Sequence, residues 1–133
     1  MNNNDIQKEV YIMANMDYIE RDYFEQLFNM GSGYVLDFTN RTFQEFVYEK
    51  IQVDVYSRYE RLSKAKMLRC IMSDYSDVVV GKLLLELMRY MQAKGMVTDK
   101  NSVTFTPLYN FIHNNQRTKA LISEPLQKHL ILL

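Results

Sequence analysis

The sequence predicts an all-α protein: a compact orthogonal bundle of five to seven helices around a central apolar helix. Glycine and proline number only four and two among 133 residues, which is too few for the many turns of a β-sandwich or barrel. Hydrophobic residues make up 47% and charged residues 24% of the chain, as is typical of a globular protein. The length suits one core, so residues 1–133 are expected to form a single helical domain.

Two helices are expected in the first thirty residues, over about Asp5 to Met16 and about Ile19 to Met30. In the second segment, apolar side chains recur at helical spacing and acidic side chains fill the other face. The apolar set is Tyr23, Phe24, Leu27 and Phe28. The run Gly31-Ser32-Gly33 follows, and glycine is the usual residue for the left-handed conformation that ends a helix. We therefore expect the second helix to end at this run, before a short apolar connector over residues 34–38.

A third helix is expected to begin at Thr42. Thr42 and Glu45 match the capping-box pattern, in which a hydroxyl residue is followed three positions later by a carboxylate. Asn40 is a competing cap two residues earlier. The residues expected to face the core are Phe43, Phe46 and Val47. Residues 53–59 are ambiguous and could be loop or extended chain.

The next two helices include the most apolar element of the chain. Ser63 can cap a helix that runs to about residue 73. Ser76 or Asp77 then opens a helix that runs to Lys94 and ends at Gly95. The polar stripe of this helix consists of Lys82, Glu86 and Arg89. A helix that is apolar on most sides is buried on most sides, so residues 77–94 are expected to form the central helix.

Beyond residue 95, the expected elements are shorter. Residues 96–98 and 103–105 are apolar or β-branched at most positions and flank a polar stretch, so they could form a small β-hairpin near 96–105. Thr106-Pro107 fits an N-cap followed by the first helical position, which predicts a helix to about His113. Pro125 similarly predicts a last short helix that ends in the apolar residues 130–133. This final tetrapeptide either docks on the core or binds a partner.

Several classes of protein are disfavoured by the composition. Cys70 is the single cysteine, so an intramolecular disulfide cannot form and a cytoplasmic location is expected. The first residues do not resemble a signal peptide, and no apolar run approaches the ~20 residues that cross a bilayer, so no membrane association is expected. His113 and His129 lie sixteen residues apart and far from Cys70. No metal-binding, phosphate-loop or catalytic motif is present, so we expect no metal site, no cofactor and no catalytic residue.

The charges are divided unevenly along the chain, although the formal net charge is zero. Residues 1–60 carry eleven acidic and five basic side chains, a net charge of −6. Residues 61–133 carry five acidic and eleven basic side chains, a net charge of +6. If the two halves occupy different faces, the protein is a charge dipole that favours an anionic partner or a second copy of itself. The alternative is that acidic and basic helices pack together and neutralise each other.

A basic cluster is the most suggestive candidate for a binding site. Five basic side chains fall within twelve residues, with Glu60 as the only acid among them and with Tyr56 and Tyr59 interleaved. The five are Arg58, Arg61, Lys64, Lys66 and Arg69. Such a cluster could bind phosphates while the tyrosines stack on bases. A solvated helix face is the alternative, and the pI near 6.7 is low for a nucleic-acid-binding domain. A DNA-reading winged helix is disfavoured. Its recognition helix needs a polar and basic exposed face, whereas the helix expected in that position, over residues 77–94, is the most apolar of the chain.

Four blocks of the chain resemble a helical module of bacterial abortive-infection and anti-phage defence proteins. The blocks are MGSGYVLDF at 30–38, TFxEF at 42–46, SKAxxLR at 63–69 and VVGxLLxxLxxY at 79–90. Their common order is more specific than any single block, and together they span about half of the chain. In that family the module looks like an N-terminal part that precedes an effector domain. The resemblance therefore implies a sensing, scaffolding or regulatory role for a chain that lacks such a domain.

The resemblance also singles out particular residues. It makes Lys64 and Arg69 the more interesting of the basic residues, and it marks the first block as either a structural corner or an interface. The first-block candidates are Gly31, Gly33, Tyr34 and Asp37.

Taken together, these features predict a non-enzymatic helical interaction or regulatory module of a bacterial defence or mobile-element system. Its expected partner is another protein or a second copy of the chain, for example in a homodimer. One alternative is a nucleic-acid-binding component that uses residues 58–69. A second is a small hydrolase or nuclease whose site is assembled only by the fold.

Overall fold

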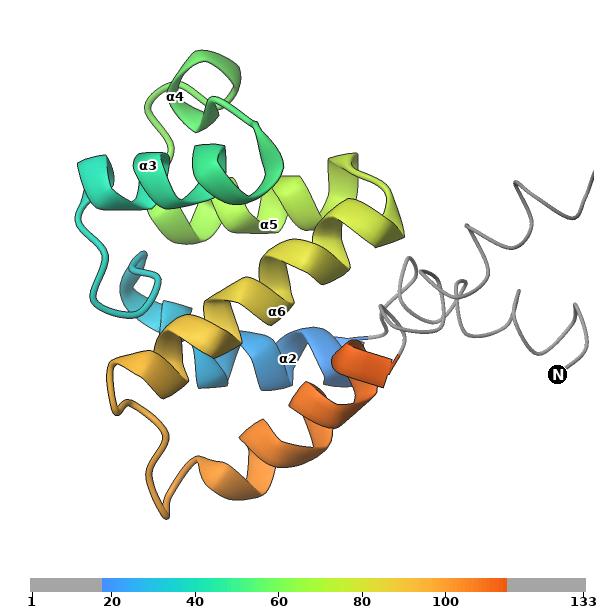
Figure 1. Cartoon of the computed structure of the whole chain (residues 1–133). Coiled ribbons are helices and arrows are strands. Elements are labelled where there is room, and N and C mark those ends of the chain that lie inside the picture. Colours follow the sequence, from blue (N-terminus) through green and yellow to red (C-terminus); the bar gives the residue numbers. More distant parts are fainter. Residues whose placement is uncertain (1–17, 115–133) are drawn as a thin grey trace, which may run out of the picture.

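The computed structural model describes residues 18–114, which form helices joined by short connections (Figure 1). The elements are α2 (Tyr18–Leu27), the 3₁₀ helix η1 (Met30–Ser32), α3 (Asn40–Ile51), α4 (Val55–Arg58), α5 (Lys64–Asp74), α6 (Asp77–Ala93) and a helix over residues 102–114. This architecture confirms the predicted all-α class. The helices predicted over residues 5–16 and from Pro125 lie outside the described residues.

Helix α6 lies at the centre of the fold, as its apolar composition predicts. Figure 1 shows it crossing between α3 and α5 on one side and α2 and the 102–114 helix on the other. Its buried residues are Val80, Gly81, Leu83, Leu84, Leu85, Leu87, Met88 and Met91. Full burial of each large apolar side chain stabilises the fold by about 1.5–3 kcal/mol before entropy is subtracted. The predicted central helix is therefore confirmed.

Three predicted helix ends are also confirmed. The Ser63 hydroxyl accepts a hydrogen bond from the backbone N–H of Lys66 at 3.2 Å, and Ser76 caps α6 in the same way. At the other end of α6, Gly95 has φ 67°. The N–H groups of residues 95 and 96 bond to the carbonyl oxygens of residues 92 and 91, at 3.2 and 2.8 Å. This pair of bonds is a Schellman motif, which needs the left-handed conformation that glycine supplies.

The predicted start of α3 is wrong. Thr39 is the cap, and neither Asn40 nor Thr42 is. The N–H of Thr42 bonds to the Thr39 hydroxyl at 3.1 Å, and the N–H of Thr39 bonds to the Thr42 hydroxyl at 2.9 Å. The two threonines therefore make the reciprocal capping pair that a Glu or Gln usually completes. Thr42 is the third residue of the helix, and Glu45 is an exposed residue of its second turn.

The predicted end of α2 is also wrong. The helix ends at Leu27, and the left-handed turn residue is Asn29, with φ 56°. Gly31 then lies inside η1 and not at a cap. Gly33 ends η1 with φ 89°. The chain thus turns twice where the glycine run predicts one stop.

The predicted hairpin near 96–105 is absent, because residues 99–101 form a turn and residue 102 begins a helix. The Asn101 side chain folds this segment: its oxygen accepts from the N–H of Thr98 at 2.7 Å, and its nitrogen donates to the carbonyl of Met96 at 2.9 Å. Thr106 and Pro107 therefore lie within the 102–114 helix and do not start it. The ambiguous residues 53–59 contain the short helix α4.

Candidate interaction surface

The five residues of the basic cluster do not form one patch. Arg58 ends α4, Arg61 lies in the connection to α5, and the other three residues lie along α5. Arg61 has φ 69°, so the chain changes direction within the cluster. Arg58 and Arg61 therefore do not lie on the helix that carries Lys64.

Arg58 and its tyrosine neighbours form a polar link between α4 and the end of α5. The Arg58 Nε donates to the Tyr59 hydroxyl at 3.2 Å, and this hydroxyl donates to Asp74 Oδ2 at 2.7 Å. The guanidinium carbon also lies 5.0 Å from the centre of the Tyr75 ring. Burial and the hydrogen bond to Asp74 raise the pKa of Tyr59 to about 12. The hydrogen bond to Tyr59, followed by the electrostatic effect of the nearby Tyr75 side chain, raises the pKa of Arg58.

Lys64 and Arg69 also contact other parts of the protein. The Lys64 ammonium donates to Asn40 Oδ1 at 2.9 Å and lies 4.8 Å from the centre of the Tyr34 ring. Lys64 is itself buried. Arg69 forms an ion pair with Glu25 of α2 through both its Nε and its terminal nitrogen. Arg69–Glu25 joins the basic second half of the chain to the acidic first half.

Two members of the basic cluster remain on the surface. Arg61 and Lys66 are exposed, and within residues 18–114 the structure gives neither side chain an ion pair or hydrogen bond. The tyrosine nearest to both in the sequence, Tyr59, is buried. Stacking on a base therefore cannot use Tyr59 in this arrangement.

The first block of the resemblance forms a structural corner. The carbonyl of Gly33 accepts from the N–H of Ala65 at 3.0 Å, and the Tyr34 ring covers Lys64. Asp37 Oδ1 accepts from the Tyr90 hydroxyl at 2.5 Å. Gly31 has open space around its α-carbon.

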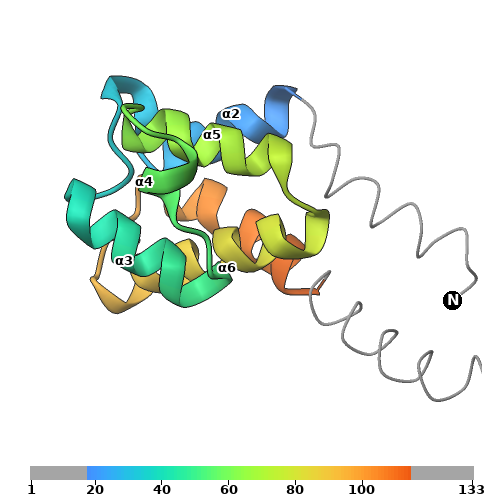
Figure 2. The same cartoon turned by 90° about the horizontal axis from the view of Figure 1, so that it is seen from above.

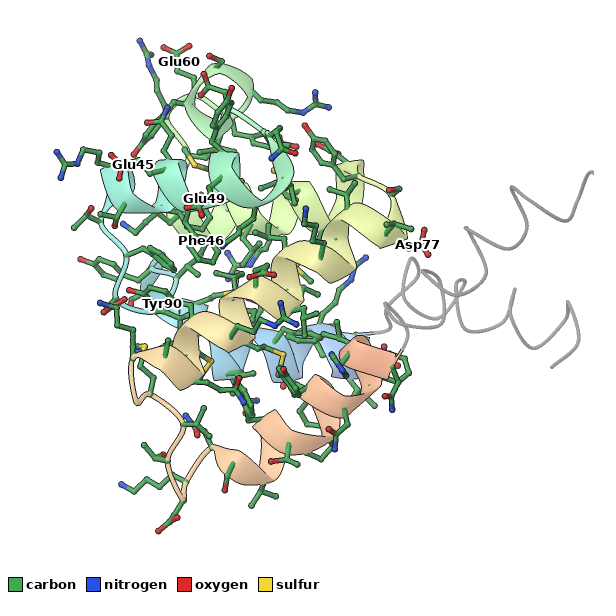
Figure 3. All side chains as sticks on the ribbon, in the orientation of Figure 1. Glu45, Phe46, Glu49, Glu60, Asp77 and Tyr90 are labelled. Atoms are coloured by element: carbon green, nitrogen blue, oxygen red, sulfur yellow. The ribbon has the colours of Figure 1, made fainter. Side chains whose placement is uncertain are left out.

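Aromatic rings join the same block to α3 and α6. The rings of Phe38 and Tyr90 are stacked with their centres 4.4 Å apart. Phe46 of α3 packs edge-on against Tyr90 at 5.7 Å, and Figure 3 labels both residues. Burial, followed by the bond to Asp37, raises the pKa of Tyr90 to about 12. All four blocks of the resemblance thus contact one another in the fold.

An apolar groove lies on another part of the molecule, between α2, the first half of α6 and the 102–114 helix. Figure 1 shows α2 and the 102–114 helix on the same side of α6, and Figure 2 shows these helices from above. The groove has a volume of about 180 Å³. Its lining residues are Glu20, Tyr23, Phe24, Val80, Gly81, Leu84, Leu108, Phe111 and Ile112. Among the described residues that line it, only Glu20 is charged.

Exposed apolar side chains lie on the three helices that form this groove. Tyr23 and Phe111, which line it, are 44% and 38% exposed. Most of the large apolar residues that are exposed in the described part of the chain lie on the same three helices: Tyr18, Ile19, Tyr23, Val78, Val103 and Phe111. A neighbouring depression shares Tyr23 and Leu108 with the groove and extends it to Val103. A concave site lined almost wholly by apolar side chains is a candidate for binding an apolar side chain of a ligand or partner.

No local pattern in the sequence predicts this groove. Tyr23 and Phe24 were expected to face the core together, but only Phe24 is buried. The wall of the groove opposite α2 is formed by the 102–114 helix. Residues 103–105 of this helix were expected to be a strand. A groove between α2 and residues 108–112 depends on contacts that are distant in the sequence. The exposed apolar face is recognisable in the sequence only from Tyr18, Ile19 and Tyr23, which lie one and four positions apart.

Two acidic side chains of α2, Asp22 and Glu25, have partners within the protein. Asp22 and Glu25 line a shallow surface depression, but Glu25 is paired with Arg69 and Asp22 accepts from the Gln26 amide at 2.7 Å. Within residues 18–114 no three His, Cys, Asp or Glu side chains are arranged to hold a metal ion. Nor does any helix in this range have the length and apolar composition needed to cross a bilayer.

Comparisons of the chain with protein-family models, with curated proteins and with solved structures find no match. The resemblance to defence modules therefore stays a prediction based on the four sequence blocks.

Proposed function

We propose that this chain is a non-enzymatic interaction module that binds an amphipathic helix of a protein partner in the apolar groove. The observation that carries the proposal is a groove of about 180 Å³ whose lining is apolar except for Glu20 and includes the exposed aromatic side chains of Tyr23 and Phe111. Helix-in-groove recognition places apolar anchors at spacings of three and four residues into such a site. Glu20 on the wall favours a partner helix with a basic flank.

The four-block resemblance supports a cytoplasmic role in a bacterial defence or mobile-element system. The blocks build the scaffold, whereas the groove lies mainly outside them. Different partners could therefore be bound by the same scaffold through changes in α2 and the 102–114 helix. The residues proposed to bind are Tyr23, Leu108 and Phe111.

The test compares two matched variants, Tyr23→Lys in the groove and Tyr48→Lys on α3. Both tyrosines are exposed, at 44% and 58%, so both variants should fold with changes within about 0.5 kcal/mol. The wild-type chain is immobilised, and proteins that it retains from a lysate of the organism that encodes it are identified. The helix of such a protein that binds the chain is then synthesised as a labelled peptide. We expect Tyr23→Lys to weaken binding of this peptide about tenfold or more, as for an interface anchor, and Tyr48→Lys to leave it unchanged. Equal affinities for the wild-type chain and Tyr23→Lys would exclude the groove.

The nucleic-acid alternative is tested separately. It rests on Arg61 and Lys66, because the other three basic residues have partners within the protein. Two phosphate contacts correspond to a slope of about −2 in a plot of log affinity against log salt concentration. Binding of single-stranded DNA or RNA that is lost in Arg61→Ala/Lys66→Ala and retained in Tyr23→Lys would favour this function over the groove.

A further inference from the structure

One candidate ligand for the groove belongs to the same chain. Residues 115–133 directly follow the 102–114 helix, which forms one wall of the groove. Phe111 and Ile112 line the groove, and residue 114 is the last residue that the structure describes. Residues 115–125 can span at most about 36–40 Å when fully extended. The floor from Val80 to Leu84 covers about 6 Å along α6. The chain that follows the 102–114 helix is therefore long enough to return to the groove.

The sequence of this segment fits a helix-in-groove ligand. After Pro125, which suits the first position of a helix, the residues Leu126, Leu130 and Leu133 follow at spacings of four and three. Such residues line one face of a helix and match the anchor pattern of helix-in-groove ligands. A cavity of about 150 Å³ lined by apolar side chains can hold benzene, so a groove of about 180 Å³ has room for a leucine side chain.

Charge distinguishes this segment from the other end of the chain. Residues 115–133 carry Arg117, Lys119 and Lys128 against a single acid, Glu124, for a net charge of +2. Residues 1–17 carry three acids and one lysine, for a net charge of −2. The charged side chain on the groove wall is the carboxylate of Glu20, which favours the basic segment over the acidic one.

We propose that residues 126–133 bind in the groove of their own molecule, with Leu126, Leu130 and Leu133 directed into it. The segment then competes with any partner helix and lowers its apparent affinity in proportion to the fraction of molecules whose groove is closed. Only this competition rests on the function proposed above. Occupancy of the groove by the segment stands independently of it.

Paramagnetic broadening in the full chain tests the proposal. A nitroxide is attached at Gln127→Cys in a Cys70→Ser background, so that the label is the only modified thiol. We expect selective loss of amide signal for Tyr23, Gly81 and Phe111, and unchanged signal for Tyr48 on α3. Leu126→Asp/Leu130→Asp with the same label should restore the lost signals. If Cys70→Ser disturbs the fold, Cys70→Ala serves as the background.

A mixed sample separates binding within one molecule from binding between two. Isotope-labelled chain without nitroxide is combined with spin-labelled chain of natural isotope content. We expect no broadening in this mixture. Broadening of the groove signals here would assign the segment to a second copy and overturn the proposal, as would the absence of selective broadening in the first sample. A partner peptide that binds to Tyr48→Lys but not to Tyr23→Lys would still support the proposed function in either case.

Discussion

The hydroxyl of Tyr59 offers a direct test of how α4 is held against α5. The Tyr59 side chain is 9% exposed, and its hydroxyl donates to Asp74 at 2.7 Å. Tyr59→Phe keeps the buried ring and removes this hydrogen bond. A hydrogen bond to a charged group contributes about 1.5–3 kcal/mol. Asp74 is exposed and can be hydrated in the variant, so we expect a loss near the lower limit, about 1.5 kcal/mol, in urea denaturation. The corresponding fall in melting temperature is about 5–10 °C.

The same hydroxyl predicts a pH dependence. Its pKa is about 12 in the folded protein and about 10 in the unfolded chain. A raised pKa stabilises the folded state fully below pH 10, and this contribution is lost as the pH rises through 12. The stability difference between wild type and Tyr59→Phe should therefore shrink from pH 10 to pH 12. Tyr90 titrates in the same range in both proteins, so its effect cancels from the difference.

A double-mutant cycle provides the control. In an Asp74→Ala background, Tyr59→Phe should cost clearly less than in the wild type, because the acceptor is already absent. A cost below about 0.5 kcal/mol in the wild-type background would refute the proposed role of the hydrogen bond. An unchanged difference up to pH 12 would refute the assignment of the titrating group.

Three further substitutions test the fold. Leu87 is fully buried, so Leu87→Ala should cost about 2–5 kcal/mol in chemical denaturation, and a cost under 1 kcal/mol would contradict the central position of α6. Gly33 has φ 89°, and an added Cβ would lie 3.4 Å from the Cβ of Ser63. Gly33→Ala should therefore lower the free energy of unfolding by more than about 1 kcal/mol, and an unchanged melting temperature would argue against this corner. Pro107 cannot donate to the carbonyl of residue 103, so Pro107→Ala should stabilise the protein by up to about 3 kcal/mol, whereas destabilisation would argue against a continuous 102–114 helix.

The sequence predicted those features that depend on local patterns. The apolar periodicity of residues 77–94 identified the central helix, because a helix with one thin polar stripe must be buried. Ser63, Ser76 and Gly95 identified helix ends through chemistry confined to one turn. The start of α3 was missed because Thr42 completes a capping pair that the pattern assigns to Glu or Gln. The hairpin predicted over residues 96–105 was wrong. The apolar and β-branched residues there favour strands, and the sequence does not show that the Asn101 side chain bonds to the backbone of residues 96 and 98.

The candidate sites were harder to predict for a different reason. Proximity in the sequence suggested that the five basic residues act together, but Asn40 and Glu25 engage Lys64 and Arg69 from distant helices. The left-handed turn at Arg61 divides the cluster further. The groove depends on three helices whose mutual packing no local pattern reveals.

The central position of α6 has a consequence for the motions of the folded protein. An amide of the middle turns, such as that of Leu84 or Leu87, has a packed helix on either side of it. It can exchange its hydrogen with solvent only when the whole bundle opens. The four-residue helix α4 lies at the edge and can detach while α6 stays covered, so its amides should exchange through cheaper local openings. The protein should therefore show two levels of protection from hydrogen exchange, and the free energy measured at Leu87 should equal that of global unfolding.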